Sequence, residues 1–164
     1  SHARLSQSVD YEAELAVVIG KTGCDIDEAD ALSHVFGYTI INDIAARDIQ
    51  YTDGQWDLSK SLDSFCPMGP VIVDRESIDL ENTSIKLWVN DQLRQNGNSS
   101  DMIFSVANVI ATLSAGMTLY PGDIISTGSP AGVGMCMTPP TYLKAGDRIR
   151  ISISQIGDLI NTMV

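Results

Sequence analysis

The chain has 164 residues and a mass of 17.7 kDa, and its 10 Lys and Arg against 21 Asp and Glu give a formal net charge of −11. This negative balance repels polyphosphate backbones at long range and argues against nucleic acid as a partner. The 44% hydrophobic content is that of a globular chain, and no apolar run reaches the ~20 residues that cross a bilayer, so we expect one domain over 1–164, cytoplasmic and without a membrane partner.

Strands dominate the predicted elements. Short apolar or alternating runs bounded by Gly, Pro, Asn or Asp are typical of strands. They occur at 15–20, 38–41, 71–73, 85–89, 124–127 and 148–156. The pattern predicts a mainly β fold with short helices, of the α+β class.

Two helices are expected between these strands. The first is capped by Asp25 or Asp27 and continues to about Phe36. The second starts at Asp101, has apolar residues at spacings of three and four, and stops before Gly116.

Three acids alternate along the chain just before the run 15–19. In an extended strand Asp10, Glu12 and Glu14 would project from one face, about 6.6 to 6.8 Å apart. A solvated strand face is the ordinary explanation for such a pattern. The apolar run that follows instead indicates a strand entering the interior, where a cation would offset the cost of burying carboxylates.

Asp43 is a third candidate ligand, because it ends another apolar strand. Taken alone, it is an ordinary turn aspartate. If Glu12, Glu14 and Asp43 converge, their oxygens suit Mg²⁺ or Mn²⁺, and Ca²⁺ also fits. Zinc is disfavoured, because the cysteines and histidines show no ligand spacing.

Cationic side chains are scarce, which draws attention to Arg47 and Lys60. Either one is explained equally well as a surface charge. As functional groups they would bind an anionic substrate and stabilise developing negative charge, with Gln50 adding a neutral hydrogen bond.

The glycine-rich run 127–134 follows a predicted strand and lacks the P-loop pattern. Alone, it is best explained as a plain loop. We expect Cys66 to pack in the core, His34 to be structural and His2 to lie in a fraying end.

In series, several stretches resemble the fumarylacetoacetate hydrolase family. They are 9–20, 37–39, 42–43, 46–50, 60–70, 119–125 and 127–134, in family order. Each stretch is weak evidence alone, but in series they are strong evidence, and they are spread over nearly the whole chain.

The resemblance implies a mixed β-sandwich roll, usually dimeric. It places a divalent cation on Glu12, Glu14 and Asp43. It assigns Arg47, Gln50 and Lys60 to the substrate pocket, with the loop at Gly128 and Ser129 beside them.

The resemblance further implies an enzyme acting on a small 2-oxo or 2,4-diketo acid. Hydrolytic cleavage of a carbon–carbon bond is the leading expectation, with Lys60 and Arg47 stabilising an enolate. Decarboxylation of oxaloacetate-like acids, isomerisation or dehydration at the same site are alternatives, as is a non-catalytic, metal-stabilised dimerisation module. Ser129 replaces the Thr of many members, and the upstream segment that carries a general base in several members precedes the residues seen here.

Overall fold

The computed structural model describes residues 5–164, and His2 lies outside the described residues. The strands are β1 (Val9–Asp10), β2 (Ala13–Ile19), β3 (Val35–Asn42), β4 (Ala45–Ala46), β5 (Met68–Asp74), β6 (Ser84–Val89), β7 (Gln92–Asn98), β8 (Ile124–Ser126), β9 (Arg148–Ile153) and β10 (Gly157–Thr162). The α-helices are α1 (Arg47–Asp53), α2 (Trp56–Lys60) and α3 (Val106–Ser114). Short 3-10 helices lie at Ala31–His34, Arg75–Ser77, Ser99–Asp101 and Gly134–Cys136.

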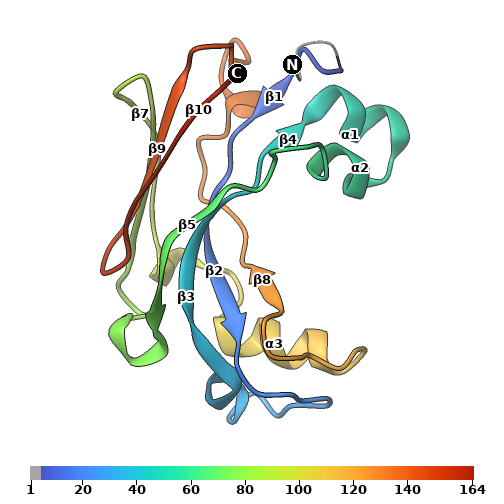
Figure 1. Cartoon of the computed structure of the whole chain (residues 1–164), viewed down its shortest axis with the longest axis vertical. Helices are drawn as coiled ribbons and strands as arrows, with labels where there is room; N and C mark the ends of the chain where they lie inside the picture. Colours follow the sequence, from blue (N-terminus) through green and yellow to red (C-terminus); the bar gives the residue numbers. More distant parts are fainter. Residues whose placement is uncertain (1–4) are drawn as a thin grey trace.

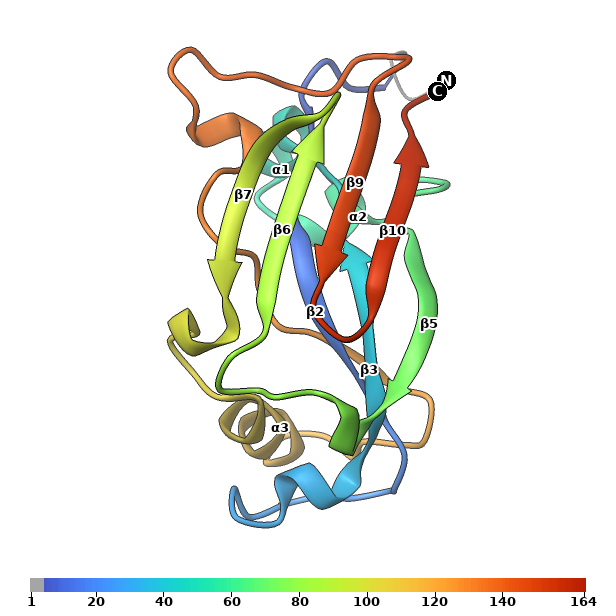
Figure 2. The same cartoon turned by 90° about the vertical axis from the view of Figure 1, so that its left-hand side faces the viewer.

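Two four-stranded antiparallel sheets form the body of the molecule. One has the strand order β10-β9-β6-β7 and the other β5-β3-β2-β8, while β1 and β4 form a separate small pair. The two sheets face each other, as Figure 1 shows from the side and Figure 2 from the face of the first sheet. The predicted mainly β class, and the sandwich-type architecture, are confirmed.

The core lies between the sheets and follows from the residue pattern. In β6 and β9, buried and half-buried residues alternate, so isoleucine, leucine and valine face inward along both strands. All seven residues of β2 are buried. A strand covered on both faces is continuously apolar rather than alternating, which explains the run after Glu14.

The second predicted helix exists but begins later than expected. Ser105 caps α3, since its hydroxyl accepts a hydrogen bond from the backbone N–H of Asn108 at 3.0 Å. Asp101 instead ends a 3-10 turn, and Ile103, counted in the apolar stripe, is 91% exposed. The better N-cap therefore sets the helix start.

The predicted helix from Asp25 to Phe36 was wrong. Only Ala31–His34 forms a 3-10 turn, and Val35 already belongs to β3, where it pairs with Ile19. Phe36, the expected end of the helix, is an exposed residue of β3, with 60% of its surface accessible.

Two further features of the fold differ from expectation. The strand expected over 148–156 is a hairpin, in which β9 turns at 154–156 into β10, with Gln155 at φ 67°. The helices α1 and α2, which the sequence did not predict, follow the small strand β4.

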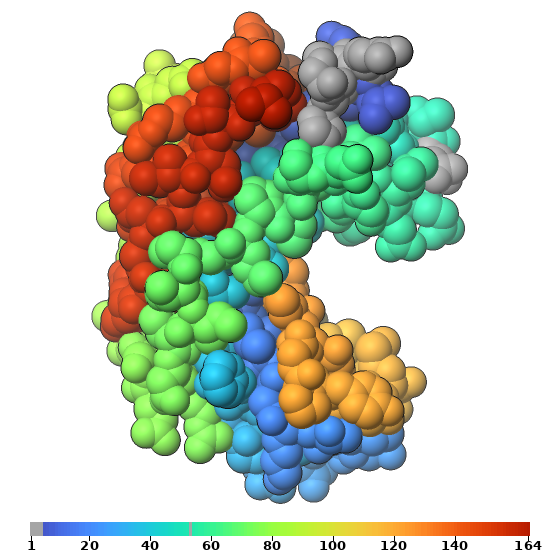
Figure 3. Space-filling model, in the orientation of Figure 1, coloured from blue at the N-terminus to red at the C-terminus, as the bar shows by residue number. Residues whose placement is uncertain are grey.

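The helices flank one side of the second sheet. In Figure 1, α1 and α2 lie at one end of this side and α3 at the other. Figure 3 shows a deep hollow between these two ends. Among the described residues, no helix combines the length and apolarity needed to cross a membrane.

Candidate active site

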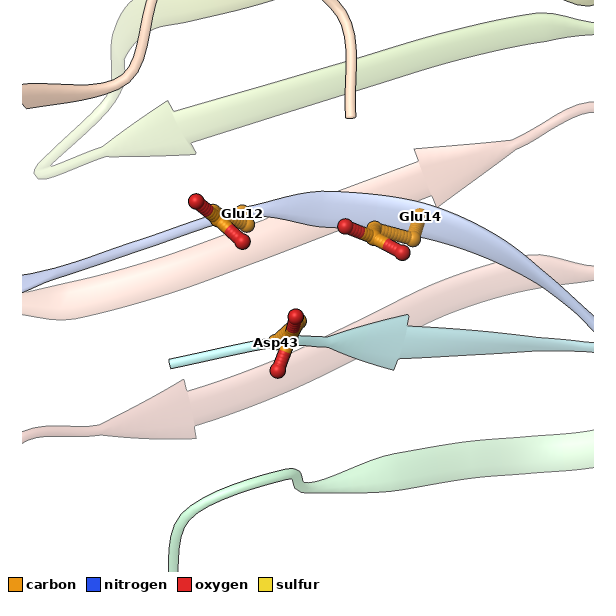
Figure 4. A group of neighbouring side chains, drawn as sticks. All are labelled: Glu12, Glu14 and Asp43. Carbon is orange, nitrogen blue, oxygen red and sulfur yellow. The ribbon is translucent and has the colours of Figure 1, made fainter. Parts of the chain in front are cut away.

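Pairing of β2 with β3 brings the three predicted carboxylates together. Ala13 lies opposite Asn42, and just beyond this pair the N–H of Asp43 donates to the carbonyl of Glu12 at 2.8 Å. One oxygen from each of Glu12, Glu14 and Asp43 lies within 4.8 Å of the others. Figure 4 shows the two glutamates along one ribbon and Asp43 at the end of its neighbour.

The clustered side chains are mostly buried but retain some contact with solvent. The side chains of Glu12 and Asp43 are 12% and 19% exposed, and that of Lys60 is 23% exposed. Two cavities of about 500 and 540 Å³ lie elsewhere. The elements that carry the cluster instead border the hollow of Figure 3.

Lys60, at the end of α2, joins two of the acids. Its ammonium donates to Glu12 Oε2 at 2.8 Å and to Asp43 Oδ2. The helix, which the sequence did not predict, therefore delivers the lysine that the sequence singled out. A strong positive charge lies directly against the carboxylate cluster.

Arg47, at the start of α1, is buried and bound on three nitrogens. Its Nε donates to Asp10 at 3.0 Å, its Nη1 to Gln50 at 3.0 Å and its Nη2 to Glu12 at 2.5 Å. Only 5% of Arg47 and 5% of Gln50 is exposed. Through these hydrogen bonds, Arg47 holds the side chains of Glu12 and Gln50 in a fixed orientation relative to each other.

Asp10 differs from the two glutamates with which it alternates in sequence. The expected continuous strand is interrupted at Tyr11 and Glu12, between β1 and β2. Asp10 is fully buried and accepts from the backbone N–H groups of Gly134 and Met135 at 2.7 and 3.0 Å. Through these hydrogen bonds, Asp10 therefore links Arg47 to the turn that follows the glycine-rich run.

The glycine-rich run lies against the cluster through Glu14. Ser126 Oγ and the N–H of Gly128 both donate to Glu14 Oε2, at 2.5 and 2.9 Å. Ser129, predicted to contact substrate, is half-buried in the same loop. The glycine-rich loop therefore lies beside the candidate metal ligand Glu14, whereas the sequence alone favoured a plain loop with no functional role.

Two buried amides that the sequence did not single out also build the site. Asn42 Oδ1 accepts from the N–H of Glu12 at 3.1 Å. Gln95 accepts from the N–H of Ala13 at 2.9 Å and donates to the carbonyl of Pro130 at 2.6 Å. For Asn42, the available signal is an amide at the end of an apolar strand. The polar sequence of β7 gives no such signal for Gln95.

Burial and charge set the ionisation of the cluster. Burial raises the pKa of Glu14 above its usual value, although Ser126 and Gly128 stabilise its charged form. Burial also raises the pKa of Asp43, which Lys60 partly offsets. Burial alone would lower the pKa of Lys60, but Asp43 and Glu12 reverse this and raise it, so Lys60 is an ammonium near neutral pH.

Cys66 does not pack in the core as expected. As a residue it is exposed, and it has φ 59°. Partial desolvation of its sulfur by neighbouring groups, together with the negative charges of Asp43 and Glu14, raises the pKa of the thiol and makes it a poor nucleophile. His34 Nδ1 lies 3.0 Å from the carbonyl of Lys21, in agreement with a structural role.

The donor chemistry of the cluster fits a hard divalent cation. Three carboxylates supply only oxygen ligands, and their separation allows all three to reach one ion. Arg47 and Lys60 balance the negative charge from one side. Enzymes that act on small organic acids use such sites to bind and polarise the substrate.

Comparison with known proteins identifies the family. The Fumarylacetoacetate (FAA) hydrolase C-terminal family matches residues 1–164. Oxaloacetate tautomerase YisK of Bacillus subtilis (strain 168) is 55% identical over 162 residues, which are 98% of this chain and 54% of that protein. The chain therefore spans about half the length of the curated relatives that it matches.

Solved structures agree in fold. A fumarylacetoacetate hydrolase from Exiguobacterium antarcticum superposes with a TM-score of 0.97 at 50% identity, over 99% of this chain and 58% of that one. A 2-hydroxyhepta-2,4-diene-1,7-dioate isomerase from Mycobacterium marinum superposes with a TM-score of 0.89 at 42% identity, over 97% of this chain and 60% of that one. The chain belongs to the fumarylacetoacetate hydrolase family, as its C-terminal domain type.

Proposed function

We propose that this chain carries the active site of a divalent-metal-dependent enzyme that converts a small 2-oxo dicarboxylic acid through its enol form. Enzymes of the family act on small organic acids and are typically metal-dependent. The observation that carries the proposal is the convergence of Glu12, Glu14 and Asp43 beside the ammonium of Lys60.

Glu12, Glu14 and Asp43 would hold the cation, and Mg²⁺ or Mn²⁺ suits an all-oxygen set, with Ca²⁺ as the larger alternative. When bound, the cation would polarise the 2-oxo and carboxylate oxygens of the substrate. Without the cation, the net negative charge of the chain would repel a dianionic acid.

Lys60 is the proposed proton donor at the substrate oxygen. Keto–enol tautomerisation moves one proton from carbon 3 to the oxygen on carbon 2. A general base, which the resemblance to the family places upstream of these residues, would take the proton from carbon 3. The Lys60 ammonium, placed beside the carboxylate cluster, would donate a proton to the oxygen, stabilise its charge and regain a proton from solvent. Arg47 holds Glu12 and Gln50 in place, and Gln50, Gly128 and Ser129 form the proposed substrate contacts.

Tautomerisation or isomerisation is preferred because a relative with 55% identity is named an oxaloacetate tautomerase. Hydrolysis of a carbon–carbon bond in a 2,4-diketo acid is the second candidate, favoured by the similar Exiguobacterium protein, which is named a fumarylacetoacetate hydrolase. Both reactions place negative charge on the same enolate oxygen, which Lys60 would stabilise. We also propose that the protein acts as a homodimer.

Substrate assays separate these reactions. With Mg²⁺ or Mn²⁺ present, the protein is mixed with oxaloacetate while enol absorbance and pyruvate formation are followed, and with acylpyruvates while diketo absorbance is followed. Faster enol–keto interconversion without pyruvate supports the tautomerase. Pyruvate release from oxaloacetate indicates a decarboxylase, and loss of diketo absorbance indicates a hydrolase. No rate enhancement with any acid would contradict the proposal and favour the non-catalytic dimerisation module.

A further inference from the structure

Glu14 is the most deeply buried of the three clustered acids, and one of its oxygens is already bound. The residue is 4% exposed. Its Oε2 accepts from Ser126 Oγ at 2.5 Å and from the N–H of Gly128 at 2.9 Å. These two donors come from the end of β8 and from the loop that follows it.

The sheet register explains why Ser126 reaches this carboxylate. β2 pairs antiparallel with β8, with Ala16 opposite Ser126. Glu14 lies two residues before Ala16 and shares its face of the strand, so it is the diagonal neighbour of Ser126. The strand pairing therefore places the two residues next to each other.

Two hydrogen bonds occupy the acceptor capacity of one carboxylate oxygen, because each oxygen offers about two lone-pair sites. Glu14 Oε2 is thereby committed to Ser126 and Gly128. No hydrogen bond to Oε1 is seen among the described residues, and we infer that this oxygen is the one offered to an ion shared with Glu12 and Asp43. The arrangement makes Glu14 a ligand through a single oxygen of fixed direction.

The geometry points to Ser126 as a positioning residue that aims Glu14 Oε1 at the metal position, an inference that rests on the proposed function. Groups that hydrogen-bond a metal ligand set its orientation, and losing one typically weakens metal binding by roughly 10–100-fold. Gly128 donates to the same oxygen, so the proposed substrate loop is anchored on a metal ligand.

A purely structural role is the competing explanation, in which Ser126 only offsets the cost of burying Glu14. Ser126 itself is exposed, so its replacement by alanine removes a hydroxyl without opening a core cavity. In this variant, a change in metal affinity or in the orientation of Glu14 indicates that Ser126 positions the carboxylate. A change in the free energy of unfolding alone indicates that Ser126 only offsets the cost of burying Glu14.

The test compares S126A, S126T and S152A by calorimetric titration with Mn²⁺, together with a crystal structure of S126A. Ser152 lies in β9 of the other sheet and serves as the matched control. We expect S126A to bind Mn²⁺ roughly 10–100-fold more weakly, S126T to restore binding and S152A to match the wild type. Glu14 should adopt another rotamer in S126A, and turnover at saturating Mn²⁺ should recover.

The possible failures are distinguishable. Wild-type affinity in S126A, or an unmoved Glu14, overturns the positioning role while leaving the metal site intact. Turnover that stays low at saturating Mn²⁺ also overturns it, because Ser126 would then act on the substrate. Absence of Mn²⁺ binding by the wild type overturns the proposed function itself, and the inference with it.

Discussion

The ammonium of Lys60 is the single charge on which the proposed chemistry most depends. It contacts Glu12 and Asp43, and its raised pKa keeps it protonated. We expect K60M to lower kcat by about 10²–10⁴, the usual contribution of a positioned proton donor. Metal affinity should persist, because no ligand oxygen is removed.

Steady-state kinetics and Mn²⁺ calorimetry check this prediction. K144M is the matched control, since Lys144 is exposed and distant from the three acids in the described structure. Ordinary turnover by K60M would remove Lys60 from the mechanism.

Acidification should weaken metal binding. Burial raises the folded-state pKa of Glu14 above 4.5 and that of Asp43 above 3.8, so protons compete with the cation already above these values. The metal-free protein holds these protons more tightly than a free carboxylate does, and metal binding must release them. Calorimetry in two buffers of different ionisation enthalpy should show proton release that grows as pH falls toward the ordinary carboxylate range. A pH-independent affinity through that window would contradict the assignment.

At the scale of elements, the loop after β8 depends on a glycine. Gly132 has φ 113°, and a Cβ there would lie 2.0 Å from the carbonyl oxygen of Arg94. We expect G132A to destabilise the protein by at least about 1–3 kcal/mol, the usual cost of such a conformation. G116A is the control, because its Cβ would meet nothing within 4 Å and its φ is ordinary, so its effect should lie within about 0.5 kcal/mol. Urea unfolding measures both variants, and equal stabilities would show that the loop tolerates the side chain.

Sequence patterns predicted some of the strands and helices correctly and missed others. The cores of β2, β3, β6 and β9 were predicted, because buried strands have continuous or alternating apolar residues. The helix α1 was missed, since its sequence contains Ile49, Tyr51 and Thr52 and its N-cap Ala46 offers no side-chain bond. Tertiary contacts of Arg47 hold it instead.

Some residues of the candidate site could likewise be predicted from the sequence, and others could not. Glu12, Glu14, Asp43, Arg47 and Lys60 stood out by charge in an apolar or cation-poor context, and the structure gathers them. Ser126, Gln95 and Asn42 did not stand out, because their roles arise from partners 30 to 112 residues away in sequence. Local patterns do not encode such contacts, and one-residue details of strand register decide them.

At the scale of the whole molecule, one hydrophobic core joins both sheets. Ile151 is fully buried in β9, between Leu87 of β6 and Leu159 of β10. The same cluster includes Leu15 and Val17 of β2 in the opposite sheet. We therefore propose that residues 5–164 unfold as one cooperative unit.

I151A tests this proposal. The cavity should cost about 2–5 kcal/mol, and circular dichroism and tryptophan fluorescence should report the same urea midpoint before and after the substitution. Two separate transitions would show that the sheets are independent units.

A crystal structure with Mn²⁺ shows directly whether carboxylates from two strands bind one hard cation. We expect one anomalous peak in contact with oxygens of Glu12, Glu14 and Asp43, absent from E14Q crystals, with the Lys60 ammonium moved from between Glu12 and Asp43. A structure without this peak, in which Lys60 still bridges Glu12 and Asp43 at saturating Mn²⁺, would contradict it.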